Sequence, residues 1–354
     1  MLDIDGARYS GSGTIVRQAV AFSALTGIPI HLYHVRAKRP KPGLRRQHLR
    51  VVQAIGELVN ASLTDVYEGS QDFRFVPHAL NPASQYVWDI GSAGSTTMLA
   101  LAVLPVLAFR SSSTVAEIHG GVFQDFAPSV FHLEHVMQPW LQAMGLRATV
   151  TLVRPGYVPT GRGVIRLEVE PVPDRLAPLI FHRSTAVQKV WGIALASHLA
   201  ERRVAQRMAD AANRTLVRAG HRADIEIRED TTAHQAGAAL ALFADCEGGI
   251  RLGADRAGAP GRRSEDIGRQ VAKQLLDDLA TGATLDRFAA DQIIPFAALA
   301  DGESRFLIPG QTDHIESNAW LAHLFLGAKV TVHGHRLNIT GTGYRPFSST
   351  GVRS

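Results

Sequence analysis

Residues 86–109 read YVWDIGSAGSTTMLALAVLPVLAF, a stretch whose pattern recurs along the chain. A β-rich run at 86–90 leads into a loop of small residues at 91–95 and then into a long apolar run at 96–109. This order predicts a strand, a glycine-rich turn and a helix. Backbone N–H groups at the start of such a helix suit a bound phosphate, although a turn that only packs a strand against a helix has the same sequence.

The same order of elements occurs before and after this stretch, which predicts internal repeats with a period of roughly 80 residues. The first copy spans residues 1–85, with a Gly/Ser loop at 6–14 that precedes an apolar helix, and the second spans 86–177. A third copy, 281–354, lacks only its first strand. The sequence therefore predicts an α/β fold built from three βαβαββ repeats.

Residues 178–280 break this rhythm and predict a small α/β domain inserted before the third repeat. We expect helices at 186–220 and 264–279, with strand-like runs at 223–227 and 238–243. The main domain then comprises residues 1–177 and 281–354.

The composition is that of a globular protein, with 45% hydrophobic and 19% charged residues among 354. A single cysteine, Cys246, excludes an internal disulfide and a cysteine-based zinc cluster. The longest apolar run, 98–109, is too short to span a bilayer, and the amino terminus has no signal-like core. We expect a cytoplasmic protein with no membrane partner.

Basic residues exceed acidic ones, 37 against 32, and they gather in one segment. Between Arg36 and Arg50 lie seven basic residues and no acidic one. Two interpretations fit this cluster: a solvated helix face and a surface that binds phosphate.

One histidine stands at a helix start. His314 lies in the polar segment 310–318, between a strand-like run and an apolar helix. Since most of the 15 histidines are expected at the surface or at helix caps, this position alone does not assign it a function.

Several motifs together resemble the RNA 3′-terminal phosphate cyclase family. The resemblance covers nearly the whole chain outside the inserted segment. Its motifs are Asp5-Gly6-Ala7 with the loop ending in Arg17, the basic segment 36–49 with Pro42-Gly43-Leu44 and Gln47-His48-Leu49, Gly91-Ser92-Ala93-Gly94-Ser95, Gly120-Gly121 with Ala127-Pro128, the glycines of segment 156–163, Asp291-Gln292, and the His314 loop ending in Asn318.

The resemblance implies an enzyme that uses ATP and a divalent metal, Mg²⁺ or Mn²⁺, on RNA with a 3′-phosphate end. In the family, the histidine that matches His314 attacks the α-phosphorus of ATP, and the adenylyl group then passes to the RNA 3′-phosphate, which cyclises. Arg17, Arg39, Lys41 and Arg46 are the expected cations that neutralise charge on the phosphates. The expected adenylate-binding residues are Phe288, Asp291, Gln292, Leu101 and Pro128.

Four positions depart from the family pattern. Ser10 stands where the family has a glutamate that is a metal ligand, so the metal-binding residues stay unassigned. Thr14 replaces a glutamine, Leu101 replaces an adenine-facing glutamine, and Arg162 interrupts a triple glycine. These departures predict an activity that is weakened, redirected or supported by a different metal.

Three functions fit these motifs: an RNA cyclase, an adenylyltransferase acting on another phosphorylated nucleic-acid end, and a non-catalytic cyclase-like protein that binds RNA. The histidine favours the first two, because cyclase-like ribosome-assembly proteins lack it. Enolpyruvyl transferases share a related repeat architecture but need no nucleophilic histidine loop. The sequence assigns no oligomeric state.

Overall fold

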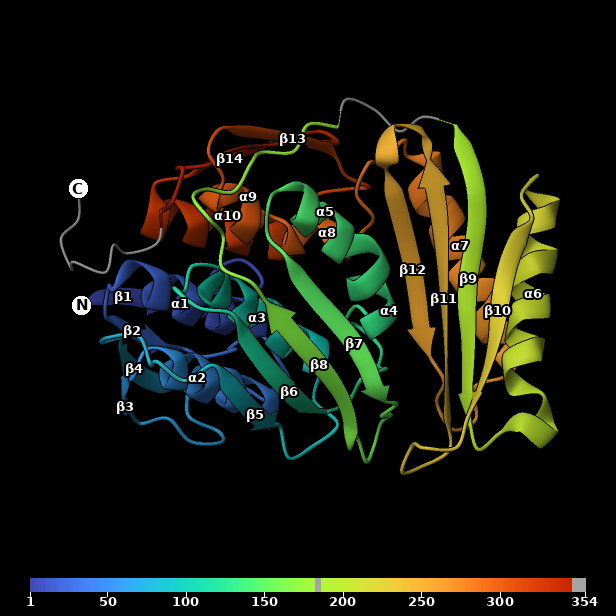
Figure 1. Cartoon of the computed structure of the whole chain (residues 1–354), viewed down its shortest axis with the longest axis horizontal. Helices are drawn as coiled ribbons and strands as arrows, with labels where there is room; N and C mark the ends of the chain where they lie inside the picture. The colour runs from blue at the N-terminus through green and yellow to red at the C-terminus, as the bar shows by residue number, and fades with distance from the viewer. Residues whose placement is uncertain (182–185, 346–354) are drawn as a thin grey trace.

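The computed structural model describes residues 1–181 and 186–345, and it confirms the predicted mixed α/β fold class (Figure 1). Residues 182–185, at the start of the expected inserted domain, and 346–354, at the end of the expected third repeat, lie outside the described part. Within the described part, no helix has the length and apolarity needed to cross a bilayer.

The first sheet has strand order β1-β2-β4-β3, with β1 parallel to β2 and the other neighbours antiparallel. Its elements are β1 Leu2–Asp5, α1 Gly13–Thr26, β2 Ile30–Tyr33, α2 Arg46–Leu58, β3 Ser62–Thr64 and β4 Asp72–Val76. A parallel neighbour requires a crossover, and α1 provides it between β1 and β2.

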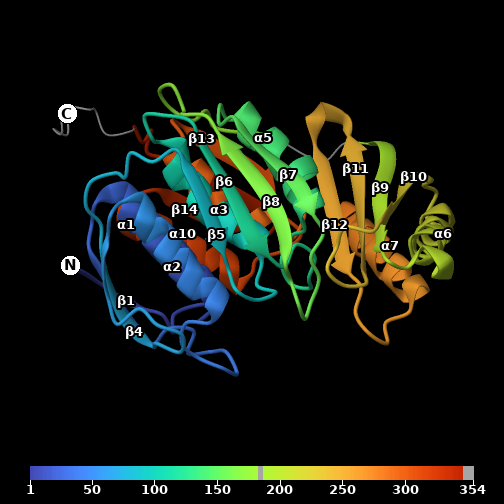
Figure 2. The ribbon, with the colours of Figure 1, turned by 60° about the horizontal axis from the view of Figure 1, so that its bottom comes forward.

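The second sheet repeats this connectivity in the order β5-β6-β8-β7. Its elements are β5 Gln85–Asp89, α3 Thr96–Ala108, β6 Thr114–Gly120, α4 Val130–His132, the π-turn η1 Leu133–Met137, α5 Gln138–Ala143, β7 Ala148–Arg154 and β8 Gly163–Val169. Both views place this sheet between the first sheet and the sheet of strands β9 to β12, whose bounds are given below (Figures 1 and 2).

A three-stranded sheet, β13-β15-β14, contains the last strands. The elements of this region are α8 Ala289–Gln292, α9 Ile294–Leu299, β13 Glu303–Leu307, α10 Asp313–Leu326, β14 Lys329–His333 and β15 Arg336–Thr340. Residues 179–181 pair with β13 in parallel, through an isolated bridge between Ile180 and Arg305. This short segment occupies the edge where a first strand of the third repeat would lie.

A separate sheet, β10-β9-β11-β12, belongs to residues 187–280, called here the 187–280 unit. Its elements are β9 Val187–Ser197, the 3₁₀ turn η2 Ala200–Arg202, α6 Val204–Arg218, β10 Ala223–Asp230, β11 Gly237–Cys246, the turn η3 Glu247–Gly249, β12 Arg251–Ala257 and α7 Ser264–Ala280. One face packs on α6 and α7, while the other joins the main core beside η1 (Figure 1).

The expected helix at 186–220 is wrong in its first half, because residues 187–197 form β9, and β12 was not predicted. β9 lies inside its sheet, and its second half is buried on both faces. A strand of this kind has a continuous apolar run instead of the alternation that marks a half-exposed strand, so periodicity alone does not separate it from a buried helix.

Two central helices are almost completely buried. In α1 every residue except Arg17 is buried, and in α3 every residue except Met98 is buried. These two exceptions line the same pocket. The apolar run at 98–109 is therefore mainly a core helix that positions a site at its amino-terminal end.

Candidate active site

The amino-terminal ends of α1, α3 and α10 meet at one pocket of about 380 Å³. Side-chain hydroxyls cap all three helices: Ser12 accepts from Thr14 N–H at 3.3 Å, Ser95 from Met98 N–H at 3.1 Å and Thr312 from Ile315 N–H at 3.3 Å. The lining consists of residues Ser12, Gly13, Thr14, Arg17, Arg36, Arg39, Gln47, His48, Ser95, Met98, Gln124, Asp125, Phe126, Ala127 and His314. The positive ends of three helix dipoles and three arginines suit an anionic ligand.

His314 is the second residue of α10, which begins at Asp313, whereas the sequence predicted that residues 311–314 lie in the loop before this helix. Its Nδ1 is 2.8 Å from Thr14 Oγ1, so residues 300 positions apart in sequence are hydrogen-bonded. Arg17 Nη2 donates to the same hydroxyl at 3.1 Å. Thr14, a departure from the family pattern, therefore links the histidine to an arginine.

The electrostatic environment favours the neutral form of His314. Burial and the charges of Arg17 and Arg39 lower the pKa of His314 below its ordinary value, and Asp313 opposes them. A neutral imidazole at physiological pH retains a lone pair on one ring nitrogen, which is what a nucleophile requires.

Arg17 and Asp291 interact electrostatically. Burial lowers the pKa of Arg17 to about 10, with Asp291 acting in the opposite direction, so Arg17 stays protonated at neutral pH. Burial also raises the pKa of Asp291 to about 6, although the Gln292 amide and Arg17 favour its ionised form. Gln292 Nε2 donates to Asp291 at 3.0 Å, and Asn318 of α10 donates to the Asp291 carbonyl at 2.6 Å.

The structure separates the arginines of the basic segment. Arg39 lines the pocket, whereas Arg46 is 59% exposed, pairs with Glu68 at 3.2 Å and donates to the Gly91 carbonyl at 2.8 Å. Arg36 also lines the pocket, and its Nη1 donates to the carbonyls of Lys41 and Gly43. Of the expected catalytic residues, the pocket therefore brings together His314, Arg17 and Arg39.

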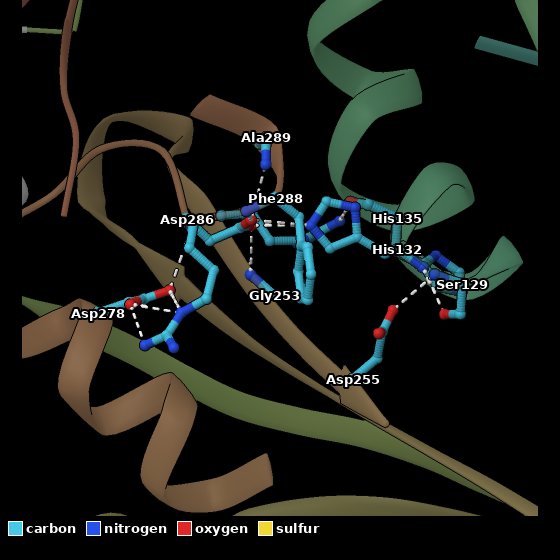
Figure 3. Close-up of polar contacts among 11 residues, drawn as sticks. Ser129, His132, His135, Gly253, Asp255, Asp278, Asp286, Phe288 and Ala289 are labelled. Atoms are coloured by element: carbon cyan, nitrogen blue, oxygen red, sulfur yellow. Dashed lines mark hydrogen bonds and ion pairs between the residues drawn. The ribbon is translucent and has the colours of Figure 1, made fainter. Parts of the chain in front are cut away.

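The expected adenylate-binding residues lie outside the pocket lining. Leu101 is buried within α3, and the Pro128 carbonyl accepts a hydrogen bond from Thr97 at 2.7 Å. The Phe288 ring lies edge-on to His132, with 5.8 Å between centroids (Figure 3). Met98 and Ala127, close in sequence to Leu101 and Pro128, are the residues that reach the pocket from these two segments.

Ser10 belongs to a buried hydroxyl network next to the pocket. Its Oγ lies 3.0 Å from Ser12 Oγ and 2.8 Å from Ser317 Oγ, which connects the first loop to α10. In the described ranges 1–181 and 186–345, no group of three or more His, Cys, Asp or Glu side chains is arranged to hold a metal ion. The donors next to Ser10 are neutral hydroxyls, which are weaker ligands for a hard divalent ion than a carboxylate.

Sequence reasoning gave no role to Gln47, His48 or the segment 124–127, all of which line the pocket. Gln47 Oε1 accepts from the Ser95 N–H at 3.1 Å, and burial with several arginines lowers the pKa of His48 well below its ordinary value. A Cβ at Gly13 would lie 2.1 Å from His48 Nε2, so this helix start requires glycine. For Gln47 and His48, the sequence feature that could have indicated a site role is their position within the basic motif.

The fold and the pocket define an α/β protein in which a neutral histidine faces an anion site. A family model described as RNA 3′-terminal phosphate cyclase matches residues 8–332. A Methanopyrus kandleri protein named RNA 3′-terminal phosphate cyclase is 37% identical over 339 residues, covering 94% of this chain and 96% of that protein. Proteins with the same name from Pyrococcus abyssi and Thermococcus onnurineus are 34% and 37% identical, each with 94% of this chain and 96% of the relative covered.

The chain belongs to the RNA 3′-terminal phosphate cyclase family, which confirms the resemblance found in the sequence.

Proposed function

We propose that this protein converts an RNA 3′-terminal phosphate to a 2′,3′-cyclic phosphate in an ATP-dependent reaction, through a covalent histidine–AMP intermediate. The observation that carries this proposal is the position of His314, which lies neutral beside Arg17 and Arg39 in a pocket formed by three helix starts. Membership of the cyclase family supports the same conclusion.

The reaction proceeds in three displacements. His314 Nε2 attacks the α-phosphorus of ATP, a P–N bond forms, and the bond to the bridging oxygen breaks to release pyrophosphate. An oxygen of the RNA 3′-phosphate then attacks the same phosphorus, which breaks the P–N bond and frees the imidazole. Finally the 2′-hydroxyl attacks the 3′-phosphorus, loses its proton to solvent and expels AMP. Covalent transfer divides one difficult substitution into easier ones.

We infer that Thr14 holds His314 in the tautomer that leaves Nε2 free to attack. For Nε2 to present its lone pair, Nδ1 must carry the proton and donate it to Thr14 Oγ1, 2.8 Å away. That oxygen has two lone pairs and also accepts from Arg17 at 3.1 Å. Arg17 thereby orients the hydroxyl, and with Arg39 it stabilises negative charge on the phosphate oxygens.

We propose that the segment 288–292 holds the adenylate, with Phe288 against the base and Asp291 and Gln292 as polar contacts, while Leu101 and Pro128 shape the apolar side. Supporting this, the segment lies next to Arg17 and is fixed by Asn318 of the histidine helix. A divalent ion, Mg²⁺ or Mn²⁺, would be held mainly by the triphosphate oxygens and would neutralise their charge.

We also propose that residues 187–280, the main part of the expected segment 178–280, act as the inserted domain of a cytoplasmic enzyme. Their separate sheet and the second core of residues between that sheet and helices α6 and α7 support this division.

Incubation with α-labelled ATP and metal tests the proposal directly. We expect an acid-labile, base-stable protein adduct that transfers its label to RNA with a 3′-phosphate and not to RNA with a 3′-hydroxyl. Label that transfers to another phosphorylated end would indicate a different adenylyltransferase, and absence of an adduct would indicate a protein that only binds RNA.

The pH dependence of adduct formation reports the His314 pKa. The quantity to measure is the rate constant for adduct formation divided by the KM for ATP, as a function of pH. Because the His314 pKa lies below the ordinary value of 6.5, this ratio should fall at acid pH with a midpoint below pH 6.5 and reach its full value above that midpoint. Arg39→Gln removes one of the charges that lower the pKa and should shift the midpoint upward. A wild-type midpoint above pH 6.5 would contradict this assignment.

Salt titration distinguishes Arg39 from Arg46. Arg39 lines the pocket, so Arg39→Ala should weaken RNA binding and flatten the slope of log affinity against log salt by roughly one unit. Arg46 is engaged by Glu68 and Gly91, so Arg46→Ala should leave that slope nearly unchanged. Equal slopes for Arg39→Ala and the wild type would identify the basic segment as a solvated face.

A further inference from the structure

A fully buried carboxylate joins three segments that are far apart in sequence (Figure 3). Asp286 accepts hydrogen bonds from the N–H groups of Phe288 at 2.9 Å and Ala289 at 3.0 Å, which open α8. It also accepts from the N–H of Gly253 in β12 at 2.9 Å. His132 of α4 completes the set, with its Nε2 2.9 and 3.0 Å from the two carboxylate oxygens.

The histidine and the carboxylate favour an ionised pair. Burial opposes charge on both groups, but the charge and hydrogen bond of Asp286 raise the pKa of His132 above its ordinary value. The same interactions, with the N–H groups of Ala289 and Gly253, lower the pKa of Asp286. A buried pair with this many hydrogen bonds is costly to break, because either partner alone is an uncompensated charge.

Steric contacts leave this junction little freedom to move. A Cβ at Gly253 would lie 2.9 Å both from His132 Cδ2 and from Val136 Cγ2, so β12 packs directly on the helix. The π-turn η1 begins one residue after His132, and such turns are frequent at functional sites. Phe288, whose ring meets the His132 ring edge-on, is the first residue of the segment 288–292.

We infer that His132 and Asp286 are positioning residues that hold the segment 288–292 in place for ATP and connect it to β12. Through the hydrogen bond from the Gly253 N–H to Asp286, the 187–280 unit then influences the affinity for the adenine nucleotide, although that unit contributes none of the residues that line the pocket. This inference rests on the proposed function, in which the same segment holds the adenylate.

Asp286→Asn tests the connection selectively. The amide oxygen still accepts from Phe288 and Ala289, but the NH₂ group meets the Gly253 N–H, so the bond to β12 is lost. We expect the KM for ATP in adduct formation to rise at least tenfold, roughly the effect of one lost charge-assisted hydrogen bond. The rate at saturating ATP and the KM for RNA should change less than about twofold, because His314, Arg17 and Arg39 are unaffected.

Asp255→Asn is the matched control. Asp255 is a buried aspartate like Asp286, but it lies in β12. It accepts a hydrogen bond from the Ser129 N–H at 2.8 Å and does not contact the segment 288–292 (Figure 3). Its substitution should lower the melting temperature and leave the KM for ATP unchanged. His132→Gln retains a donor without the charge and should raise the KM for ATP by an intermediate factor, which keeps the test open if Asp286→Asn does not fold.

Three results would overturn the inference: an unchanged KM for ATP in Asp286→Asn and His132→Gln, an equal increase in Asp255→Asn, or a loss of maximal rate with KM unchanged. A wild-type protein that forms no adduct would instead refute the proposed function. In that case calorimetric titration of ATP into the same variants measures the affinity difference directly, and equal dissociation constants would refute the inference as well.

Discussion

His314→Ala should reduce adduct formation and RNA cyclisation to background. Among the residues that line the pocket, the other histidine is His48, which lies against Gly13 at the start of α1, and no cysteine or lysine is present. Because His48 Nε2 faces Gly13 and the Gln47 amide, removal of the His314 imidazole leaves no imidazole of the lining in position to form the P–N bond. The measurement is label retained by the protein after incubation with α-labelled ATP, followed by cyclisation of RNA with a 3′-phosphate.

His323→Ala is the control, because His323 lies in the last turn of the same helix and bonds the Ala328 carbonyl at 3.3 Å. It should label like the wild type. If His314→Ala formed the adduct at the wild-type level, His314 would not be the nucleophile, and His48 would be the next residue to test.

Arg17→Ala should lower the rate of adenylyl transfer by roughly a hundredfold to a thousandfold, the usual effect of losing a donor that stabilises developing charge. Arg17 is the one residue of α1 that keeps part of its surface exposed, and it donates to Thr14, which in turn contacts His314. The substitution therefore removes the proposed phosphate contact and the N–H donor that holds the Thr14 hydroxyl. Single-turnover labelling at saturating ATP measures this effect.

Arg17→Lys preserves the charge but not the planar group that reaches Thr14, so it should recover only part of the rate. Thr14→Val isolates the hydroxyl and should give a smaller loss than Arg17→Ala. A loss confined to KM, with the transfer rate unchanged, would show that Arg17 acts only in ATP binding.

The sequence predicted much of the fold because its signals are local. The loops 6–14 and 91–95 precede apolar helices, and the structure starts α1 and α3 near the expected positions. The failure at 187–197 has the same origin, because a strand buried on both faces lacks the alternation that local reasoning detects. The edge segment 179–181 is the apolar run Leu-Ile-Phe, which is too short to predict a strand by itself, and its pairing partner β13 lies more than a hundred residues away.

The candidate site was predictable in residue type and only partly in geometry. The motifs pointed to His314, Arg17 and the basic segment. Because Arg39 and Arg46 both belong to that segment, the sequence predicted the same catalytic role for both. Tertiary contacts separate them, because Glu68 and the Gly91 carbonyl engage Arg46 outside the pocket. Ser10 likewise appeared as a missing metal ligand, whereas its hydroxyl is hydrogen-bonded to Ser12 and Ser317.

By itself the sequence determined the order of most strands and helices outside residues 179–257, the family and the histidine at the start of α10, because turn residues, helix caps and apolar periodicity act between near neighbours. Only the tertiary structure decided that Thr14 bonds His314 across 300 residues and that Asp286 joins α4, β12 and α8. These contacts arise when packed helices and sheets bring distant side chains together, and burial then makes each hydrogen bond and charge strong enough to matter.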